Sequence, residues 1–499
     1  MIVNKSAKAY LVGGGLESLA VAVYLIRDAG FAGEHITIFE RSNAAGGSMQ
    51  EFCLHHEGYK IKGIRMLNSS CIATFDLMSA IGSIGVADKT VLEETISFND
   101  QLRVSARARL VKDGKPVWID ESELTSRMLD IKTVAFNNGQ LVDEPIEHFF
   151  DPAFFDSDAW SMFGSVFCLQ PWHSINQLML CYQLVERHQI RVDTLEGLQA
   201  TKHNQFDSLI FPALRWLTDR GVDIKTGCEV TDIAFSQSSE NVRTAEQIAY
   251  SQMGNDVTLP LGAGDYVFVT TGSVTSDFSV GDHQSSAELQ DLPGRDWALW
   301  HTLSKKYSDL GNPSNFVDRI RQTTIVSFTV TSPNGKFFQL MEQLSGNIDG
   351  SAGLTTLPGS NWSISFCLPH QPYFLGQPEG LYTFWGYAMN PYNLGNFIKK
   401  AMIECSGEEI LKELIAHLGF GEHQHRILEH AICRPIVFPY FTAPLLATAA
   451  QDKPSVVPDH ASNFAIIGQF SRLENYPSLS VEYSVRSARD AVYKLLHIG

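Results

Sequence analysis

The sequence lacks the features that tie a chain to a membrane, an oxidising compartment or nucleic acid. No apolar run reaches the length of about 18 residues that a membrane-spanning helix needs, although a peripheral membrane contact stays open. No signal-like segment precedes the first apolar run, and the eight cysteines form no Cys-x-x-Cys pair. These absences predict a cytoplasmic protein with reduced thiols. Only 38 basic residues stand against 55 acidic ones, which disfavours nonspecific nucleic-acid binding.

The chain has instead both length and hydrophobic residues. At 499 residues it can form two or three domains, and its hydrophobic content of 44% supports large cores and excludes general disorder.

The most informative segment, residues 9–40, has the pattern of a strand, a glycine turn, a helix, a second strand and a terminal acid. Gly13 allows the tight turn, and Gly15 lets the backbone approach a pyrophosphate. Ser18 replaces a third glycine where the helix meets the strand. Glu40 can accept hydrogen bonds from a ribose diol, while the helix N-terminus offers N–H groups to phosphate. The pattern predicts dinucleotide binding in preference to a purely structural glycine turn.

Three further segments favour FAD over NAD. A Gly-Gly pair follows the acid within residues 41–49, as in the second phosphate-proximal loop of two-domain flavoproteins. Residues 264–272 run from an apolar strand into Thr-Thr-Gly, and residues 463–469 form another short buried strand, followed by a helix at 482–496. A fold assembled from both chain ends suits an extended cofactor. The predicted FAD-binding residues are Gly13, Gly15, Leu16, Glu17, Ser18, Glu40, Arg41, Gly46, Gly47, Ser48, Val230, Thr271, Gly272, Gln469, Ser480 and Glu482.

These patterns predict an α/β protein. We expect a Rossmann-like FAD-binding domain of the GR2 flavoprotein type, interrupted by inserted α+β substrate-binding domains rich in aromatic residues. The predicted FAD-binding domain comprises residues 1–65, about 195–275 and about 430–499. The predicted substrate-binding part comprises about 66–194 and 276–429.

Several segments carry a family resemblance. They include Gln170-Pro-Trp-His-Ser174, Phe384-Trp-Gly-Tyr-Ala388 and Glu482-Tyr-Ser-Val-Arg486, with others at residues 18–28, 194–197, 337–347, 360–362, 370–372 and 407–410. In this order, over nearly the whole chain, they resemble the oleate hydratase family, the FAD-dependent proteins once called myosin-cross-reactive antigens. The resemblance implies a homodimer that acts on free unsaturated fatty acids and adds water across a cis double bond.

The resemblance also implies two catalytic residues, and both are replaced here. The family has a glutamate in Arg-Gly-Gly-Arg-Glu-Met, where this chain has Met66 in Lys62-Gly-Ile-Arg-Met-Leu67. It has a tyrosine in Thr-Lys-Tyr-Asn-Gln-Tyr, where this chain has His203 and Phe206 at the two tyrosine positions. Hydration needs an acid at one alkene carbon and an activated water at the other. A thioether and a phenyl ring supply neither.

His203 is the remaining candidate for acid–base catalysis, because imidazole titrates near neutral pH. The alternative is a histidine that only fills a tyrosine-sized slot. The predicted substrate contacts are Met66, Phe206, Trp362, His370 and Gln371. No metal site is expected, because the adjacent His55 and His56 would point to opposite faces of a strand.

Three functions stay open at this point. The first is a FAD-dependent hydratase of unsaturated fatty acids with a rebuilt acid–base set. The second is a double-bond isomerase or flavin-driven oxidoreductase on the same scaffold, for which the glutamate is unnecessary. The third is a non-catalytic protein that binds FAD and fatty acids.

Overall fold

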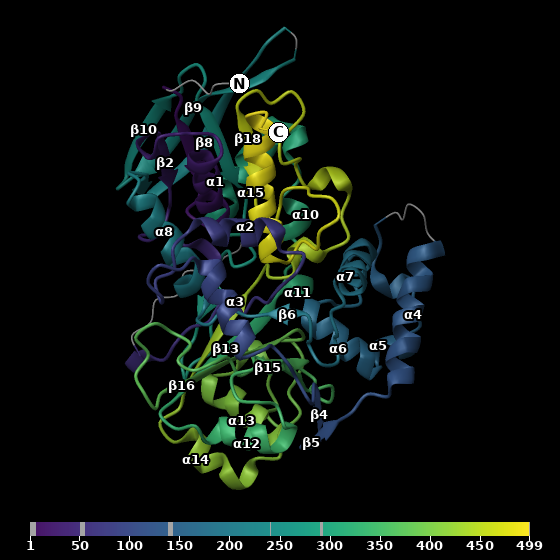
Figure 1. Cartoon of the computed structure of the whole chain (residues 1–499). Helices are drawn as coiled ribbons and strands as arrows, with labels where there is room; N and C mark the ends of the chain where they lie inside the picture. The colour runs from purple at the N-terminus through teal and green to yellow at the C-terminus, as the bar shows by residue number, and fades with distance from the viewer. Residues whose placement is uncertain (1–5, 50–54, 138–142, 240, 290–292, 499) are drawn as a thin grey trace.

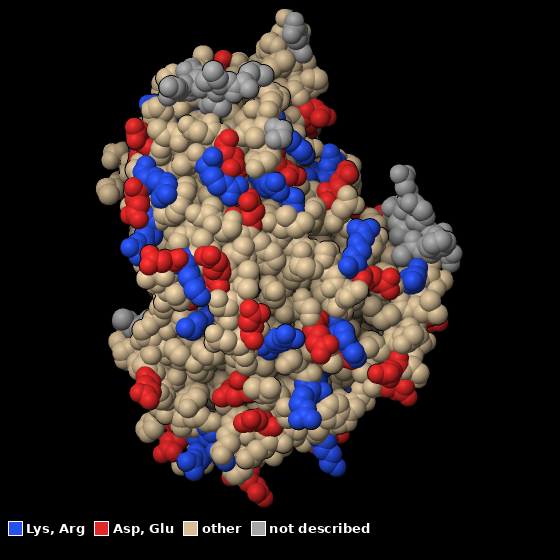
Figure 2. All heavy atoms as spheres, in the orientation of Figure 1, with Lys and Arg blue, Asp and Glu red and all other residues tan. Residues whose placement is uncertain are grey.

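The computed structural model describes residues 6–49, 55–137, 143–239, 241–289 and 293–498. Both chain ends lie in one part of the molecule, around a parallel sheet, and a larger mixed sheet forms the opposite part (Figure 1). A group of helices lies beside the two sheets. On the face shown in Figure 2, acidic and basic side chains are interspersed, with no broad area of positive charge that would suit a polyanion.

The parallel sheet has five strands. In spatial order they are β18 (Phe464–Ile467), β11 (Tyr266–Thr270), β1 (Ala9–Val12), β2 (Ile36–Phe39) and β7 (Asp223–Lys225). Successive side chains of a strand point to opposite faces, so an almost entirely apolar strand must be covered on both. In β1, Leu11 packs into a core with helices, whereas Tyr10 and Val12 pack into a second core on the other face. The sequence thus requires a layer on each side of this sheet.

Helices form one of these layers and a small antiparallel sheet forms the other. The helical layer comprises α1 (Leu16–Arg27), α2 (Ile72–Ala80), α8 (Phe211–Thr218) and α15 (Val481–Leu495). The opposite layer comprises β8 (Cys228–Gln237), β9 (Arg243–Gln252) and β10 (Asn255–Pro260). The glycine turn follows the last residue of β1 and precedes α1. It therefore lies at the carboxyl edge of the parallel sheet, where open α/β sheets bind their ligands.

The second large sheet has eight strands. In spatial order they are β12 (Ser279–Val280), β17 (Ile432–Phe438), β13 (Ile325–Ser332), β16 (Tyr382–Ala388), β15 (Ile364–Cys367), β14 (Thr355–Thr356), β4 (Leu110–Lys112) and β5 (Lys115–Val117). Phe384 of β16 packs into the core on the side of α12 (Lys336–Ser345) and α13 (Gly407–His417). Trp385 and Tyr387 belong to a different core on the opposite face, which looks toward the parallel sheet.

A helical group packs beside both sheets. Its helices are α4 (Glu121–Asn137), α5 (Pro152–Phe155), α6 (Asp158–Phe167) and α7 (Ile175–His188). Aromatic side chains of α5 and α6 pack against one another, with the Phe154 and Trp160 rings 5.4 Å apart. The aromatic-rich stretch near residue 150 therefore builds the core of this group.

The fold class predicted from the sequence is confirmed, while one predicted domain bound differs from the strand pairing. The helical segment that contains α8 begins with a π-helical turn, Phe206–Ile210. The range predicted for the FAD-binding domain starts again at about residue 430, but β17 lies in the eight-stranded sheet. Strand pairing decides this, because β17 pairs with β13 over seven residues. No helix within the described ranges is long and apolar enough to cross a membrane.

Glu413 of α13 fixes a loop of the larger sheet's domain. Its fully buried carboxylate accepts hydrogen bonds from the backbone N–H groups of Asn396 (2.7 Å), Phe397 (3.0 Å) and Ile398 (2.6 Å). Burial by itself would raise the pKa of Glu413, but His417 and these donors together lower the pKa below its usual value of 4.5.

We expect Glu413→Gln to lower the free energy of unfolding by about 2 kcal/mol near neutral pH, because charge-assisted hydrogen bonds are lost. A carboxyl group with a lowered folded-state pKa stabilises the protein above its unfolded pKa, and this contribution is lost as the pH falls through the folded value. The difference between wild type and Glu413→Gln should therefore shrink on acidification. Urea unfolding at several pH values measures it, and a constant difference would contradict the assignment.

Candidate functional site

A glycine-lined cavity of about 250 Å³ lies at the carboxyl edge of the parallel sheet, over the N-terminus of α1. Its walls come from the β1–α1 turn, the end of β2, the first residues of β8 and the segment after β11. The residues that line it include Gly13, Gly14, Gly15, Glu17, Glu40, Arg41, Gly47, Ser48, Lys62, Val230, Thr270, Gly272, Arg295 and Gln469.

Close backbone approaches shape this cavity. Gly13 has φ of +94° and its N–H donates to the Phe39 carbonyl over 2.8 Å. Gly47, with φ of +54°, passes so near the glycine turn that a Cβ on it would lie 2.8 Å from the Cα of Gly15. Both backbones are thus left uncovered by side chains. This is the cradle that a pyrophosphate requires.

Polar groups in this cavity match the parts of a dinucleotide. The Glu40 carboxylate, at the end of β2, accepts hydrogen bonds from the backbone N–H groups of Gly14 and Ser42, each over 2.7 Å. The buried Thr270 hydroxyl has no hydrogen-bond partner among the residues that the structure describes. The Lys62 ammonium lies 4.3 Å from the centroid of the Phe278 ring. The glycine cradle, the acid and the cation together fit the pyrophosphate and ribose of FAD.

The structure brings ten of the predicted FAD-binding residues to this cavity. They are Gly13, Gly15, Glu17, Glu40, Arg41, Gly47, Ser48, Val230, Gly272 and Gln469. Six lie elsewhere. Leu16 and Ser18 are buried in α1, Gly46 donates to the Gly14 carbonyl behind the turn, and Thr271 is buried beside the wall.

Ser480 and Glu482 also lie outside the glycine-lined cavity. Ser480 caps α15 by accepting from the N–H of Tyr483. Glu482 is 2% exposed, and its carboxylate accepts from the backbone N–H groups of Ala73 and Thr74 at the start of α2. The sequence does not predict this contact of Glu482 with α2, because the two lie more than 400 residues apart in the chain.

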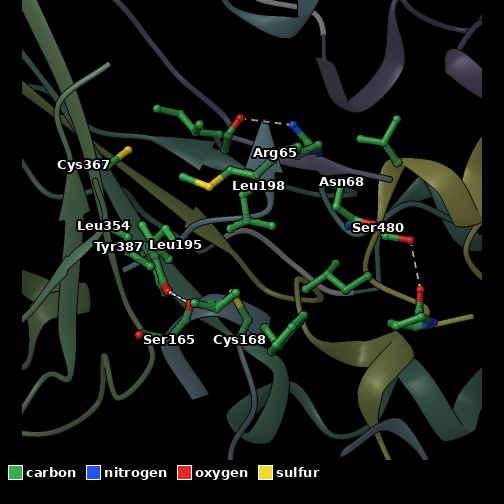
Figure 3. Close-up of a pocket in the computed structure, with 18 of the residues that line it drawn as sticks. Arg65, Asn68, Ser165, Cys168, Leu195, Leu198, Leu354, Cys367, Tyr387 and Ser480 are labelled. Carbon is green, nitrogen blue, oxygen red and sulfur yellow. Dashed lines mark hydrogen bonds between the residues drawn. The ribbon is translucent and has the colours of Figure 1, made fainter. Parts of the chain in front are cut away.

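An apolar cavity of about 170 Å³ adjoins the first one. Gln469 lines both, and the segment after Lys62 forms part of the shared wall: Lys62 lines the glycine-lined cavity, and Gly63–Met66 line the apolar one. Other residues of the apolar cavity include Asn68, Ser165, Val166, Cys168, Leu195, Leu198, Leu354, Cys367, Trp385, Tyr387, Phe441 and Leu479. Arg65 and Asn68 lie on one side of it, and Ser165 and Cys168 on the other (Figure 3).

Within the described residues, no carboxylate and no imidazole lines the apolar cavity. The Tyr387 hydroxyl donates to the Ser165 carbonyl (Figure 3), and burial raises the pKa of Tyr387 well above its usual value. Burial also raises the pKa values of Cys168 and Cys367 to about 12. These side chains therefore stay uncharged near neutral pH, and Arg65 is the only charged side chain among the described lining residues.

Two polar groups lie in or behind the wall of this cavity. Trp385 is 5% exposed, and within the described residues its indole N–H has no hydrogen-bond partner. Behind the wall, the buried guanidinium of Arg109 donates to the Leu354 carbonyl over 2.6 Å and to the Ser165 hydroxyl over 3.0 Å. Burial lowers the pKa of Arg109 to about 10, so the group remains a cation.

The other predicted site residues are divided between this cavity and the protein interior. Met66 lines the apolar cavity. His203 lines neither large cavity, and its Nδ1 lies 3.1 Å from the Pro372 carbonyl. Burial lowers the pKa of His203. Phe206 stacks on Phe211, outside the cavity. The prediction that His203 faces a substrate is not supported by this placement, because its backbone partner, the Pro372 carbonyl, belongs to the connection between β15 and β16.

Trp362, Gln371 and His370 also lie away from the apolar cavity. The fully buried Trp362 donates its indole N–H to the Asn393 carbonyl over 2.9 Å. The Gln371 amide binds backbone groups, including the Thr383 carbonyl over 2.8 Å. These two side chains are therefore satisfied by the protein itself. His370 instead lines a separate small cavity.

Sequence reasoning missed Trp385 and Tyr387 as wall residues. The signal was present, because alternate residues of an apolar strand share a face. Which face would look toward the cofactor cavity depends on the packing of the two sheets. Sequence alone therefore gave no means of choosing it.

Comparison with known structures defines the class of fold. An oxidoreductase from Methanosarcina mazei superposes with a TM-score of 0.54 over 96% of this chain and 98% of that chain, at 14% identity. A protein from Pyrococcus furiosus gives a TM-score of 0.52 over 99% and 98%, also at 14% identity. The fold is a Rossmann-like flavoprotein fold, as predicted.

Comparison with known sequences defines the family. The MCRA family model matches residues 6–493, and the chain belongs to this family. It is 32% identical over 505 residues to an oleate hydratase of Streptococcus pyogenes serotype M49 (strain NZ131), covering 98% of this chain and 85% of that protein. It is 27% identical over 530 residues to a linoleate hydratase of Lactiplantibacillus plantarum, covering 98% and 93%. The resemblance to the oleate hydratase family seen in the sequence is confirmed.

Proposed function

We propose that the protein is an enzyme that binds FAD in the glycine-lined cavity and an unsaturated free fatty acid in the apolar cavity, and that it adds water across a cis double bond. The observation that carries the proposal is the contact between the two cavities. They share Gln469 and the wall segment that begins at Lys62. A hydrocarbon chain in the second cavity would therefore lie beside the cofactor.

Two polar groups at the wall of the apolar cavity, Trp385 and Arg109, support a carboxylic acid as ligand. A fatty-acid carboxylate could accept a hydrogen bond from the indole N–H of Trp385, for which the described residues offer no other acceptor. The positive charge of the buried Arg109 guanidinium would stabilise the negative charge of that carboxylate. The oxygens that Arg109 contacts are neutral, so an anion nearby would offset part of the cost of burying the cation. The apolar lining would hold the hydrocarbon chain.

Hydration is redox-neutral. Bound FAD would therefore supply shape and electrostatics, and no net electron transfer is needed. The residues of this chain would exclude bulk water from the alkene, orient the acyl chain and place a single water. The similarity to two proteins named as an oleate hydratase and a linoleate hydratase supports this reaction.

A second function is favoured by one specific observation. Met66 lies in the cavity wall, at the position where the family pattern has a glutamate, and no carboxylate among the described residues replaces it there. A double-bond isomerase or flavin-driven oxidoreductase would not need that glutamate. The same two cavities would serve either reaction.

Mass spectrometry can separate these functions. The purified, FAD-loaded protein would be incubated in ¹⁸O-labelled water with a panel of unsaturated fatty acids, with the flavin oxidised or reduced. A product heavier by one labelled water supports hydration. An isomer of unchanged mass, or a product lighter by two hydrogens, would replace the proposal with the second function. Binding without any product would leave only a binding protein.

We expect Trp385→Phe to weaken the binding of a free fatty acid about tenfold, because a hydrogen bond to a charged group contributes roughly 1.5–3 kcal/mol. The affinity for the corresponding methyl ester should change little. Titrations monitored by flavin absorbance give both dissociation constants. Trp362→Phe is the matched control, since that indole lies outside the cavity. Equal losses for acid and ester would contradict a carboxylate partner.

A further inference from the structure

A second, smaller cavity with a few polar groups in its wall shares a lining residue with the apolar one. It is lined by Ile64, Phe98, Thr201, Gln205, His370 and Tyr373, among others, and has a volume of about 10 Å³. A cavity of roughly 10–15 Å³ is the size at which a single water fits, provided that polar groups surround it.

Two buried polar atoms in this wall have no hydrogen-bond partner within the described residues. They are the Oε1 atom of Gln205 and the Nδ1 atom of His370. Gln205 is only 4% exposed, so bulk water does not satisfy its amide oxygen. Leaving such groups unsatisfied costs about 1–3 kcal/mol each. One water bound between them would remove both penalties.

The geometry of Gln205 is fixed by its other contacts. Its amide nitrogen donates to the Arg65 carbonyl over 3.2 Å and lies 3.4 Å from the Thr201 hydroxyl oxygen. The amide oxygen is therefore left for a donor in the cavity. Burial lowers the pKa of His370, as do Lys202 and His203, so the ring is neutral near neutral pH and one ring nitrogen can accept.

The small cavity and the apolar cavity share a wall residue. Ile64 lines both, and Met66 follows it in the wall of the apolar cavity. The hydrogen bond from Gln205 to the Arg65 carbonyl joins the small cavity to this same wall segment. A water at Gln205 would thus lie behind the position where the family's glutamate is missing.

We propose that this small cavity binds one water through Gln205 and His370, and that this is the water added to the alkene in the apolar cavity. The inference rests on the proposed hydratase function. In the net reaction the alkene π bond and one O–H bond break, and a C–O and a C–H bond form. The proton lost by the water is balanced by the proton gained at the neighbouring carbon, so no further reactant is needed.

The test compares substitutions in the FAD-loaded full-length protein. Gln205→Met keeps the side-chain length and removes the acceptor oxygen, and it should lower kcat for hydration about 100-fold while fatty-acid affinity and FAD content stay within about threefold. Gln205→Glu removes the donor to Arg65 but keeps acceptor oxygens for the water, so it should retain most of the turnover. If both variants lose kcat equally, the hydrogen bond to the Arg65 carbonyl accounts for the loss and the proposal is overturned.

His370→Phe provides an independent arm. It should also lower kcat, and the double variant with Gln205→Met should be little worse than either single one, because both remove the same water. A crystal structure of the wild type should show an ordered water between the two atoms, absent in Gln205→Met. If the wild type hydrates a fatty acid and Gln205→Met does so equally fast, the assignment of the water to Gln205 is overturned, whereas the proposed function stands. A wild type that hydrates no fatty acid would overturn the proposed function and, with it, this role of the water.

Discussion

Gly47→Ala should weaken FAD binding about 100-fold or more, which corresponds to roughly 3 kcal/mol. The new Cβ would lie 2.8 Å from the Cα of Gly15, a separation that real Cβ atoms essentially never show. Relief requires the two backbone segments to separate, and these are the segments that would hold the pyrophosphate. The positive φ of Gly47, +54°, adds about 1 kcal/mol of strain for a side-chain-bearing residue. Flavin fluorescence titration of the apoprotein measures the affinity.

Gly30→Ala is the matched control. Gly30 also has a positive φ, +73°, but a Cβ there would meet nothing within 4 Å, and the residue lies in the turn after α1. It should therefore carry the same backbone strain with no steric clash and no effect on FAD. Comparable thermal unfolding of the two variants would show that both are folded. A Gly47→Ala protein that binds FAD like the wild type would refute the assignment of the glycine-lined cavity.

Glu482→Ala should lower the free energy of unfolding by about 3 kcal/mol and leave FAD affinity within about threefold. The Glu482 carboxylate accepts hydrogen bonds from the start of α2 and from the guanidinium of Arg486, 2.8 Å away. Its removal loses a helix cap, worth about 0.5–2 kcal/mol, and leaves a largely buried arginine without its carboxylate. Urea unfolding and flavin titration measure the two quantities separately.

Glu482→Gln separates the charge from the contacts. It keeps one acceptor oxygen for α2, so its loss of stability should be smaller than that of Glu482→Ala. A marked loss of FAD affinity without loss of stability, in either variant, would instead place Glu482 at the cofactor, as the sequence pattern predicted.

The sequence predicted the positions of some residues in the proposed chemistry but not of others. Met66 could be placed from the family pattern alone, because Gly63 and Arg65 before it match the family's residues. His203 could not, since the same pattern says nothing of where its ring points, and a backbone carbonyl at Pro372 decides that. His370 was predicted to contact the substrate, whereas it lines a cavity of its own beside Gln205. A motif predicts which residues lie near one another, but not which cavity each one lines.

The sequence by itself determined the unit of β1, α1 and β2, the glycine turn and the acid at Glu40, because these features depend on neighbours within about 30 residues and on side-chain periodicity. It also determined the family, through segments spread over the whole chain. Only the tertiary structure decided that Trp385 faces the apolar cavity and that Glu482 caps α2. These contacts join strands and helices far apart in the chain, and their geometry follows from how the two sheets and their helices pack, which local patterns do not encode.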